Sequence, residues 1–229
     1  MPEETQTIRL NRSLAFLRTR QYNAALSDVE SATTTATATA KLQKARFRKA
    51  EALYCLQRYR DCCEALKELC LEYPDNTAAK SLFTRAISRL AEHTNGKYLF
   101  KRLHSGAAEL RPPHLDHATY MGPVSIQASR SRGRGLFTTK AVKAGDLLFC
   151  EKAFAHAFID KEEGRSADMT LLIDSENGGT VGAQSDLINM TVQKLYRNPS
   201  LMSTITGLHH GLYQPVHATQ VDGKPVVDT

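Results

Sequence analysis

The sequence lacks any long apolar run. No stretch approaches the roughly 18 uninterrupted apolar residues that a membrane-spanning helix needs. The first residues, Met1-Pro2-Glu3-Glu4, are acidic and polar, whereas a secretory signal starts basic and continues apolar. These absences predict a cytoplasmic or nuclear protein that makes no contact with a membrane.

The sequence also lacks the cysteine spacings of zinc sites and disulfide frameworks. None of the cysteines forms a Cys-x-x-Cys motif, and no histidine lies at ligand spacing from the four in the helical half, Cys55, Cys62, Cys63 and Cys70. We therefore expect no metal site and reduced, mostly buried thiols. The pair His209-His210 has no acidic or cysteine companion at ligand spacing, which favours surface histidines.

The composition is that of an ordinary soluble protein, and its charge is uneven. At 41% hydrophobic and 24% charged residues, the chain is neither collagen-like nor wholly disordered, and 229 residues suit two small domains. Residues 1–120 hold 19 Lys and Arg against 13 Asp and Glu, whereas residues 121–229 hold 11 of each. Such a surplus is typical of a solvated helical face, and a surface for acidic peptides or nucleic acid is the alternative.

An internal repeat lies in the first half. The pattern Tyr-x-x-Ala-x-x-x-Val that begins at Tyr22 returns as Tyr-x-x-Cys-x-x-x-Leu at Tyr59, an offset of 37 residues. Tetratricopeptide repeats have a period of about 34 residues, and we expect the run from Ser31 to Ala40 to form a lengthened turn. Apolar periodicity predicts five helices, the first over about 5–18 and the last over about 77–93. The first should bury Leu10, Leu14 and Leu17.

Residues 6–74 resemble tetratricopeptide repeats. The resemblance rests on Asn11-Arg12-Ser13-Leu14-Ala15-Phe16-Leu17, Tyr22-Asn23-Ala24-Ala25-Leu26 and Lys44-Ala45-Arg46-Phe47-Arg48-Lys49-Ala50. Chaperone-binding members of that family hold the carboxylates of a peptide C-terminus with an Asn, a Lys and an Arg. The resemblance therefore implies a peptide-carboxylate-binding site at Asn11, Lys44 and Arg48.

The spacing of the two cations suits this site but does not require it. Lys44 and Arg48 are four residues apart and so project from one helix face. The alternative is that both are ordinary exposed helix residues. The family's clamp also takes a Lys and an Asn from a preceding repeat, so we expect an N-terminal repeat to be missing.

The pattern changes at Arg111-Pro112-Pro113, where we expect an extended linker over 111–120. Beyond it, short apolar runs such as Val124 to Ala128 and Leu147 to Cys150, with glycine turns between them, predict an all-β core. The aromatic run 154–158 is expected to join that core. Further on, Ser185-Asp186 predicts a helix start that Pro199 ends. A second helical piece should run from Ser200 to about His209, and Asp222-Gly223 predicts a hairpin.

The run Ser129 to Gly135 admits three interpretations. Gly133 and Gly135 let a strand's backbone approach a ligand closely, or they form a tight surface turn. Arg130, Arg132 and Arg134 could instead form a nucleic-acid arm, although no aromatic residues are interleaved with them for stacking. A dinucleotide site is excluded because a strand-like run follows where a helix is needed.

Residues 121–158 resemble the N-terminal part of a SET domain. The matching runs are Gly122-Pro123-Val124, Ser131-Arg132-Gly133-Arg134-Gly135-Leu136-Phe137, Ala144-Gly145-Asp146-Leu147-Leu148 and Glu151-Lys152-Ala153-Phe154-Ala155. The closest similarity is to fungal-type proteins that join tetratricopeptide repeats to SET, and more distantly to SET–MYND lysine methyltransferases. The resemblance implies methylation of protein lysines with S-adenosylmethionine, whose amino-acid end Gly133, Arg134 and Gly135 would cradle.

Together the two resemblances imply an α+β protein. Tetratricopeptide hairpins would occupy residues 1–110, a linker 111–120, and an incomplete β-rich SET domain 121–229, with a helical insertion at about 185–210. The partner would be a protein substrate or an acidic peptide tail. The alternative function is a non-catalytic adaptor whose repeats bind acidic peptide C-termini, such as those of chaperones.

The family's catalytic motifs are missing from these residues. The family builds its active site from an Asn-His-x-Cys motif and a late tyrosine, but this sequence has no Asn-His pair and no tyrosine after Tyr213. We therefore expect no catalytic residues here and a truncated, catalytically incomplete chain. Purified protein should methylate histones and other lysine-rich proteins no faster than a no-enzyme control, and robust turnover would contradict this expectation.

Overall fold

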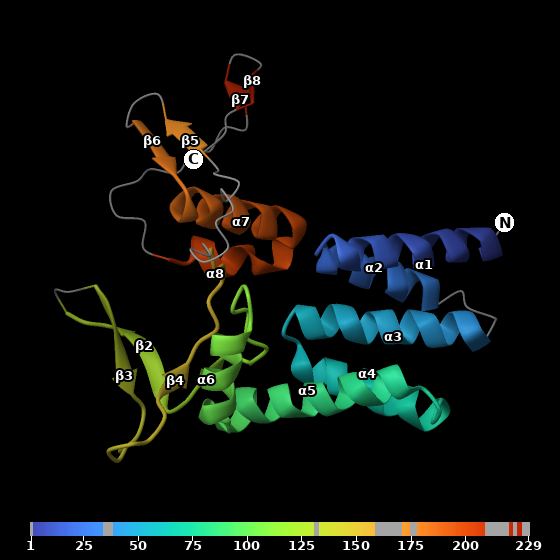
Figure 1. The fold of residues 1–229 in the computed structure, drawn as a ribbon, viewed down its shortest axis with the longest axis horizontal. Helices are drawn as coiled ribbons and strands as arrows, with labels where there is room; N and C mark the ends of the chain where they lie inside the picture. The colour runs from blue at the N-terminus through green and yellow to red at the C-terminus, as the bar shows by residue number, and fades with distance from the viewer. Residues whose placement is uncertain are drawn as a thin grey trace. The chain divides into compact units, whose positions relative to one another are not determined.

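The structure is a computed structural model that describes residues 2–33, 39–130, 133–158, 171–174, 178–208, 220–221 and 224–225. The chain divides into two compact units, residues 1–199 and residues 200–229. Helices make up most of the first unit, and the strands occur in short antiparallel pairs (Figure 1). The predicted α+β class is confirmed at this level.

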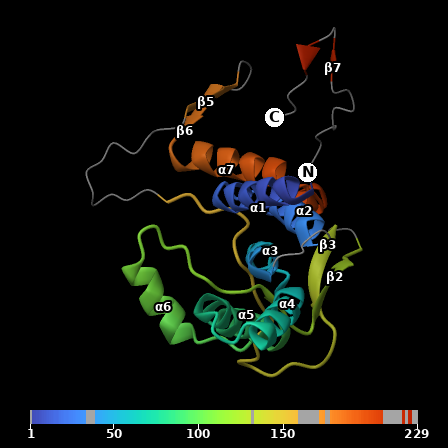
Figure 2. The ribbon, with the colours of Figure 1, turned by 90° about the vertical axis from the view of Figure 1, so that its right-hand side faces the viewer.

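The helical half is a two-layer stack. Its elements are α1 (Pro2–Arg18), α2 (Tyr22–Thr33), α3 (Thr39–Cys55), α4 (Tyr59–Glu72), α5 (Thr77–Asn95) and α6 (Phe100–Glu109). Each helix from α1 to α5 packs against the next, and α1 also contacts α3, which contacts α5. The odd-numbered helices therefore form one layer, and α2 and α4 form the other (Figure 2). In the described residues, no helix has both the length and the apolar content needed to cross a bilayer.

The core lies between these layers. Leu53, Leu66 and Leu69 are among its largest fully buried side chains, and fully buried alanines allow the helices to approach closely. The prediction that Leu14 is buried is wrong, because this side chain is 37% exposed. Ser13 is buried instead, and its hydroxyl donates a hydrogen bond to the carbonyl oxygen of Leu10 at 2.7 Å.

The repeat analysis predicted a lengthened turn from Ser31 to Ala40, but both ends of this run are helical. Helix α2 continues to Thr33 and α3 begins at Thr39, while residues 34–38 lie outside the described part. Ala32 is fully buried and packs with Leu10. It lies three residues after buried Val29 and so falls on the same helix face. The helical period therefore extends into the Thr-Ala run.

Helix α5 is capped at both ends. The side chain of Asn76 accepts a hydrogen bond from the backbone N–H of Ala79 at 2.9 Å. Gly96 ends the helix in the left-handed region at φ 63°, as the Asn95-Gly96 pair predicts, and its N–H donates to the carbonyl oxygen of Glu92. Helix α6 was not predicted. It is short, contains Gly106 and buries none of its residues.

We expect Gly96→Ala to lower the free energy of unfolding by about 1–3 kcal/mol, because a side chain is strained at this φ. A Cβ atom there would also lie 2.7 Å from the ring of Tyr120. The control is Gly106→Ala, where the added Cβ makes an ordinary 3.5 Å contact and alanine favours the helix. Urea unfolding of both variants measures the difference, and equal stabilities would contradict the cap.

The second half contains only two-stranded ladders in its described residues. The pairs are β1 (Tyr120–Met121) with β4 (Phe149–Cys150), β2 (Val124–Ala128) with β3 (Arg134–Thr138), and β5 (Leu171–Asp174) with β6 (Gly178–Val181). The expected all-β core is absent from this described part. Among residues 119–130, 133–158 and 182–208, no apolar residue is buried, Ile126 is 65% exposed, and residues 154–158 form no strand. An isolated hairpin has no second layer against which to bury a face.

The predicted late helices are present. Helix α7 (Ala183–Arg197) begins two residues before Ser185, with Gly182 at its N-cap, and the short η1 (Pro199–Leu201) follows. In the second unit, α8 (Met202–Thr206) and the pair β7 (Gln220–Val221) and β8 (Lys224–Pro225) match the predicted helical piece and hairpin. His209 and His210 lie outside the described residues.

Asn198 connects the end of α7 to the first helical hairpin. Its side-chain oxygen accepts a hydrogen bond from the backbone N–H of Tyr22 at 2.7 Å, and its amide donates to the carbonyl oxygen of Arg20 at 2.8 Å. The residue is 1% exposed. It therefore caps the start of α2 from a position 176 residues later in the chain.

Candidate functional site

The three residues of the predicted peptide clamp lie on α1 and α3. Asn11 and Lys44 are exposed, whereas Arg48 is half-buried. The guanidinium of Arg48 donates a hydrogen bond to the carbonyl oxygen of Leu10, so it lies against the turn of α1 that carries Asn11. Burial lowers the pKa of Arg48, and the charge of Glu51 acts in the opposite direction. Arg48 is therefore already engaged by α1, and its binding of a peptide carboxylate stays a prediction.

A cavity of about 210 Å³ opens beside this region. Its lining comes from α1, the start of α2 and α3, and consists of Leu14, Leu17, Arg18, Tyr22, Glu51 and Cys55. Burial raises the pKa of Glu51, which the charges of Arg48 and Arg18 oppose, and burial raises the pKa of Tyr22 to about 12. An apolar wall faced by hydrogen-bonding groups is suited to one side chain of a peptide lying along α1 and α3.

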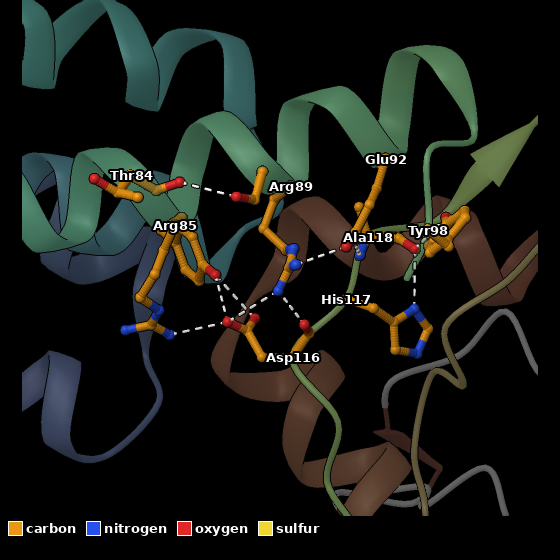
Figure 3. A network of polar contacts seen from close by, with 10 residues as sticks. Thr84, Arg85, Arg89, Glu92, Tyr98, Asp116, His117 and Ala118 are labelled. Atoms are coloured by element: carbon orange, nitrogen blue, oxygen red, sulfur yellow. Dashed lines mark hydrogen bonds and ion pairs between the residues drawn. The ribbon is translucent and has the colours of Figure 1, made fainter. Parts of the chain in front are cut away.

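A second polar site lies between α3 and α5, and we call it the Asp116 cluster. It consists of Tyr54 on α3, Arg85, Arg89 and Glu92 on α5, and Asp116 in the segment before β1. The hydroxyl of Tyr54 donates to the Asp116 carboxylate at 2.7 Å, and Arg85 donates to it at 3.1 Å. Arg89 lies 3.2 Å from the same carboxylate and forms an ion pair with Glu92 at 2.6 Å. Figure 3 shows Asp116 between the two arginines.

The cluster favours the charged form of Asp116. Burial by itself would raise the pKa of this carboxyl. The hydrogen bonds from Tyr54 and Arg85, together with the charges of Arg89 and Arg85, outweigh burial and hold the pKa below its usual value. Burial and the hydrogen bond to Asp116 raise the pKa of Tyr54. At neutral pH Asp116 is therefore a carboxylate that faces two guanidinium groups and a neutral phenol.

Side chains of α5 and the loop after it also hold the backbone that follows Asp116. The N–H of Ala118 donates to the carboxylate of Glu92 at 2.8 Å, and the hydroxyl of Tyr98 donates to the carbonyl oxygen of Ala118 at 2.7 Å. His93 Nδ1 lies 2.7 Å from the carbonyl oxygen of Thr119. Ala118 itself is fully buried in the helical core. The segment is therefore held as an extended peptide along α5.

Sequence analysis missed this cluster, although a signal was present. Arg85 follows Arg48 by the same 37 residues that separate Tyr22 from Tyr59. Arg85 and Arg89 are also four residues apart on a predicted helix, as are Lys44 and Arg48. Applying the repeat offset to Arg48 would have found Arg85, and Arg89 lies four residues further along the same helix. Nothing in the sequence pairs it with Asp116.

The predicted cofactor residues lie at the start of β3. Gly133 and Arg134 are exposed and Gly135 is partly exposed, while Ser131 and Arg132 lie outside the described residues. The N–H of Ser129 donates to the carbonyl oxygen of Gly133 at 2.7 Å, which closes the loop. Gly133 has φ 75° and open space where a Cβ would be, whereas a Cβ at Gly135 would lie 3.0 Å from the ring of Phe137.

This geometry leaves the loop backbone accessible. Gly133, Arg134 and Gly135 are not helical, and in the described residues β3 pairs with β2 alone. The exposed backbone at Gly133 and Gly135 therefore fits one wall of a site for the amino-acid end of a small molecule. The described residues contain no group of three or more His, Cys, Asp or Glu placed to hold a metal ion.

These features define a stack of helical hairpins that holds an extended segment of its own chain around Asp116, followed by strand pairs with an exposed glycine loop. Over 227 residues, which is 99% of this chain, the sequence is 40% identical to a protein of Gibberella zeae described as a methyltransferase. The chain spans 31% of the length of that relative. No protein-family profile matches the chain, and no solved structure matches it.

Proposed function

We propose that this chain is part of a protein-lysine methyltransferase that uses S-adenosylmethionine and joins tetratricopeptide repeats to a SET domain. The observation that carries the proposal is the 40% identity to a methyltransferase over 99% of the chain. Residues 1–110 would form the repeats, 111–120 the linker, and 121–229 the first part of the SET domain. The protein would act in the cytoplasm or the nucleus.

The helix pairs support the repeat assignment. Tyr22 and Tyr59, which define the internal repeat, each begin the second helix of a pair, α2 and α4. The first helices of the pairs contact one another in one layer, which is how stacked repeats bury a continuous core. Helix α5 then covers the open side of the second pair.

The glycine loop supports the cofactor assignment. Gly133, Arg134 and Gly135 match the first cofactor motif of SET domains, and their backbone is accessible. When bound, S-adenosylmethionine would supply the methyl group. The residues of this chain would bind and orient its amino-acid end through backbone groups, which glycine leaves accessible.

Calorimetric titration with S-adenosylmethionine tests this assignment. We expect the chain to give weak, saturable heat. Gly135→Val should bind at least tenfold more weakly, because the added side chain occupies the approach to the backbone. A tenfold loss of affinity requires only about 1.4 kcal/mol. The control Thr138→Val places the same side chain at an exposed position of the same strand and should leave binding unchanged. Equal binding by all three proteins would contradict the site.

The adaptor function is the second candidate, and the cavity beside Arg48 favours it. A peptide C-terminus at Asn11, Lys44 and Arg48 would place a neighbouring side chain near this hollow. Titration with a chaperone C-terminal peptide distinguishes the two proposals. Heat with the peptide that Lys44→Gln abolishes, together with no heat from the cofactor, would favour the adaptor.

A further inference from the structure

We propose that the Asp116 cluster is a receptor for extended acidic peptides, and that the chain's own segment 114–119 occupies it. An acidic segment of another protein would bind there by displacing the internal segment. This inference is independent of the methyl-transfer proposal. It assigns a binding surface on α3 and α5 that differs from the predicted clamp on α1 and α3.

The contacts of the segment are those of peptide recognition. It contains no helix or strand, and side chains from α5 and the following loop bind its backbone at Ala118 and Thr119. Such backbone contacts do not depend on the sequence of the bound peptide. Arg89 also donates to the carbonyl oxygen of Asp116, which adds a contact of the same kind.

Two positions of the segment do require particular residues. The first is Asp116, whose carboxylate meets Tyr54, Arg85 and Arg89. The second is Ala118, which is fully buried and so admits a small side chain. The receptor should therefore select an acidic residue followed two positions later by a small one.

The cluster combines a buried side with a side that solvent reaches. Arg89 and Glu92 are 14% and 7% exposed, whereas Arg85 and Asp116 are 55% and 40% exposed. An incoming carboxylate can therefore meet Arg85 before the internal one has left. The positive charge of residues 1–120 favours the approach of an acidic partner.

Displacement of the segment would be transmitted to the strands. Thr119 directly precedes β1, which contacts α5 and pairs with β4. The hydroxyl oxygen of Thr119 also accepts a hydrogen bond from the N–H of Lys152 at 3.1 Å. A peptide that replaces segment 114–119 therefore competes with the docking of β1 against the helices, and the two equilibria are linked.

The test uses a fluorescent peptide of residues 112–121 and the full chain. The internal segment competes at high effective concentration, so the wild-type chain should bind the peptide weakly. Asp116→Asn weakens the competitor, and we expect peptide affinity to rise about tenfold to a hundredfold, as expected for losing hydrogen bonds to a charged group. Adding Arg85→Gln should reduce this gain by up to about fivefold, because the peptide's carboxylate then loses a solvent-exposed partner.

Two altered peptides test whether the site requires the acidic and the small residue. Replacing the peptide's own aspartate by asparagine, or its alanine by leucine, should abolish binding to Asp116→Asn. Circular dichroism verifies that each variant keeps its helices. If Asp116→Asn does not fold, the wild-type chain at high peptide concentration carries the test, and the peptide with asparagine in place of its aspartate is the loss control. The proposal is overturned if Asp116→Asn binds no more tightly than wild type, or if Arg85→Gln leaves binding intact.

Discussion

Leu66→Ala is expected to lower the free energy of unfolding by about 3–5 kcal/mol, because it leaves a cavity in the packed core. Leu66 lies on α4 and is fully buried among the side chains of α2 to α5. The surrounding helices are fixed by their other contacts and can collapse around the cavity only in part. Urea unfolding followed by circular dichroism measures the loss.

Leu71→Ala is the matched control for this prediction. Leu71 lies on the same helix but is 75% exposed, so its truncation should change the stability by no more than about 0.5 kcal/mol. A comparable loss from both substitutions would contradict the assignment of the buried face of α4. The two-layer arrangement of the helices would then need revision.

Arg89→Met is expected to lower the free energy of unfolding by about 3 kcal/mol, because it leaves Glu92 buried without its ion-pair partner. It also removes one of the cations beside Asp116. The control is Arg85→Met, whose side chain is more than half exposed and whose loss should cost at most about 1 kcal/mol. Thermal and urea unfolding of the pair separate a buried ion pair from a solvent-screened one.

The pH dependence of the same variants provides a second readout. The pKa of Asp116 is lowered in the folded protein, so its stabilising contacts are complete above the unfolded value of 3.8 and are lost as the pH falls through the folded value. Arg89→Met lowers the free energy of unfolding in part because Asp116 loses a partner. This part of the loss should therefore shrink below about pH 4. A cost that grows on acidification would contradict the charge assignment of the Asp116 cluster.

Local periodicity was sufficient to predict α1 to α5 but not α6. The five helices from α1 to α5 follow from apolar residues at helical spacing, and Gly96 ends α5 because glycine adopts a left-handed φ without strain. The start of α7 was also placed to within two residues of Ala183. These features depend on residues that are close together in the sequence.

Features that depend on distant contacts could not be predicted in this way. Asp116 meets Tyr54 across 62 residues, and Asn198 caps α2 across 176 residues. The expected β core is absent from the described residues for a related reason, since alternation at Val124 to Ala128 predicts a strand but not the layer that would cover it. The exposed position of Gly133 at a hairpin loop did follow from the local pattern of glycines between strands.

Most of the proposed function depends on one claim. The loop at Gly133, Arg134 and Gly135 should bind the amino-acid end of S-adenosylmethionine. Amide chemical shifts of the isotope-labelled chain test it directly, in titrations with S-adenosylmethionine, methionine and adenosine. We predict that the first two ligands shift the amide signals of these three residues and that adenosine does not. Unchanged signals at this loop, or equal shifts with adenosine, would contradict the claim.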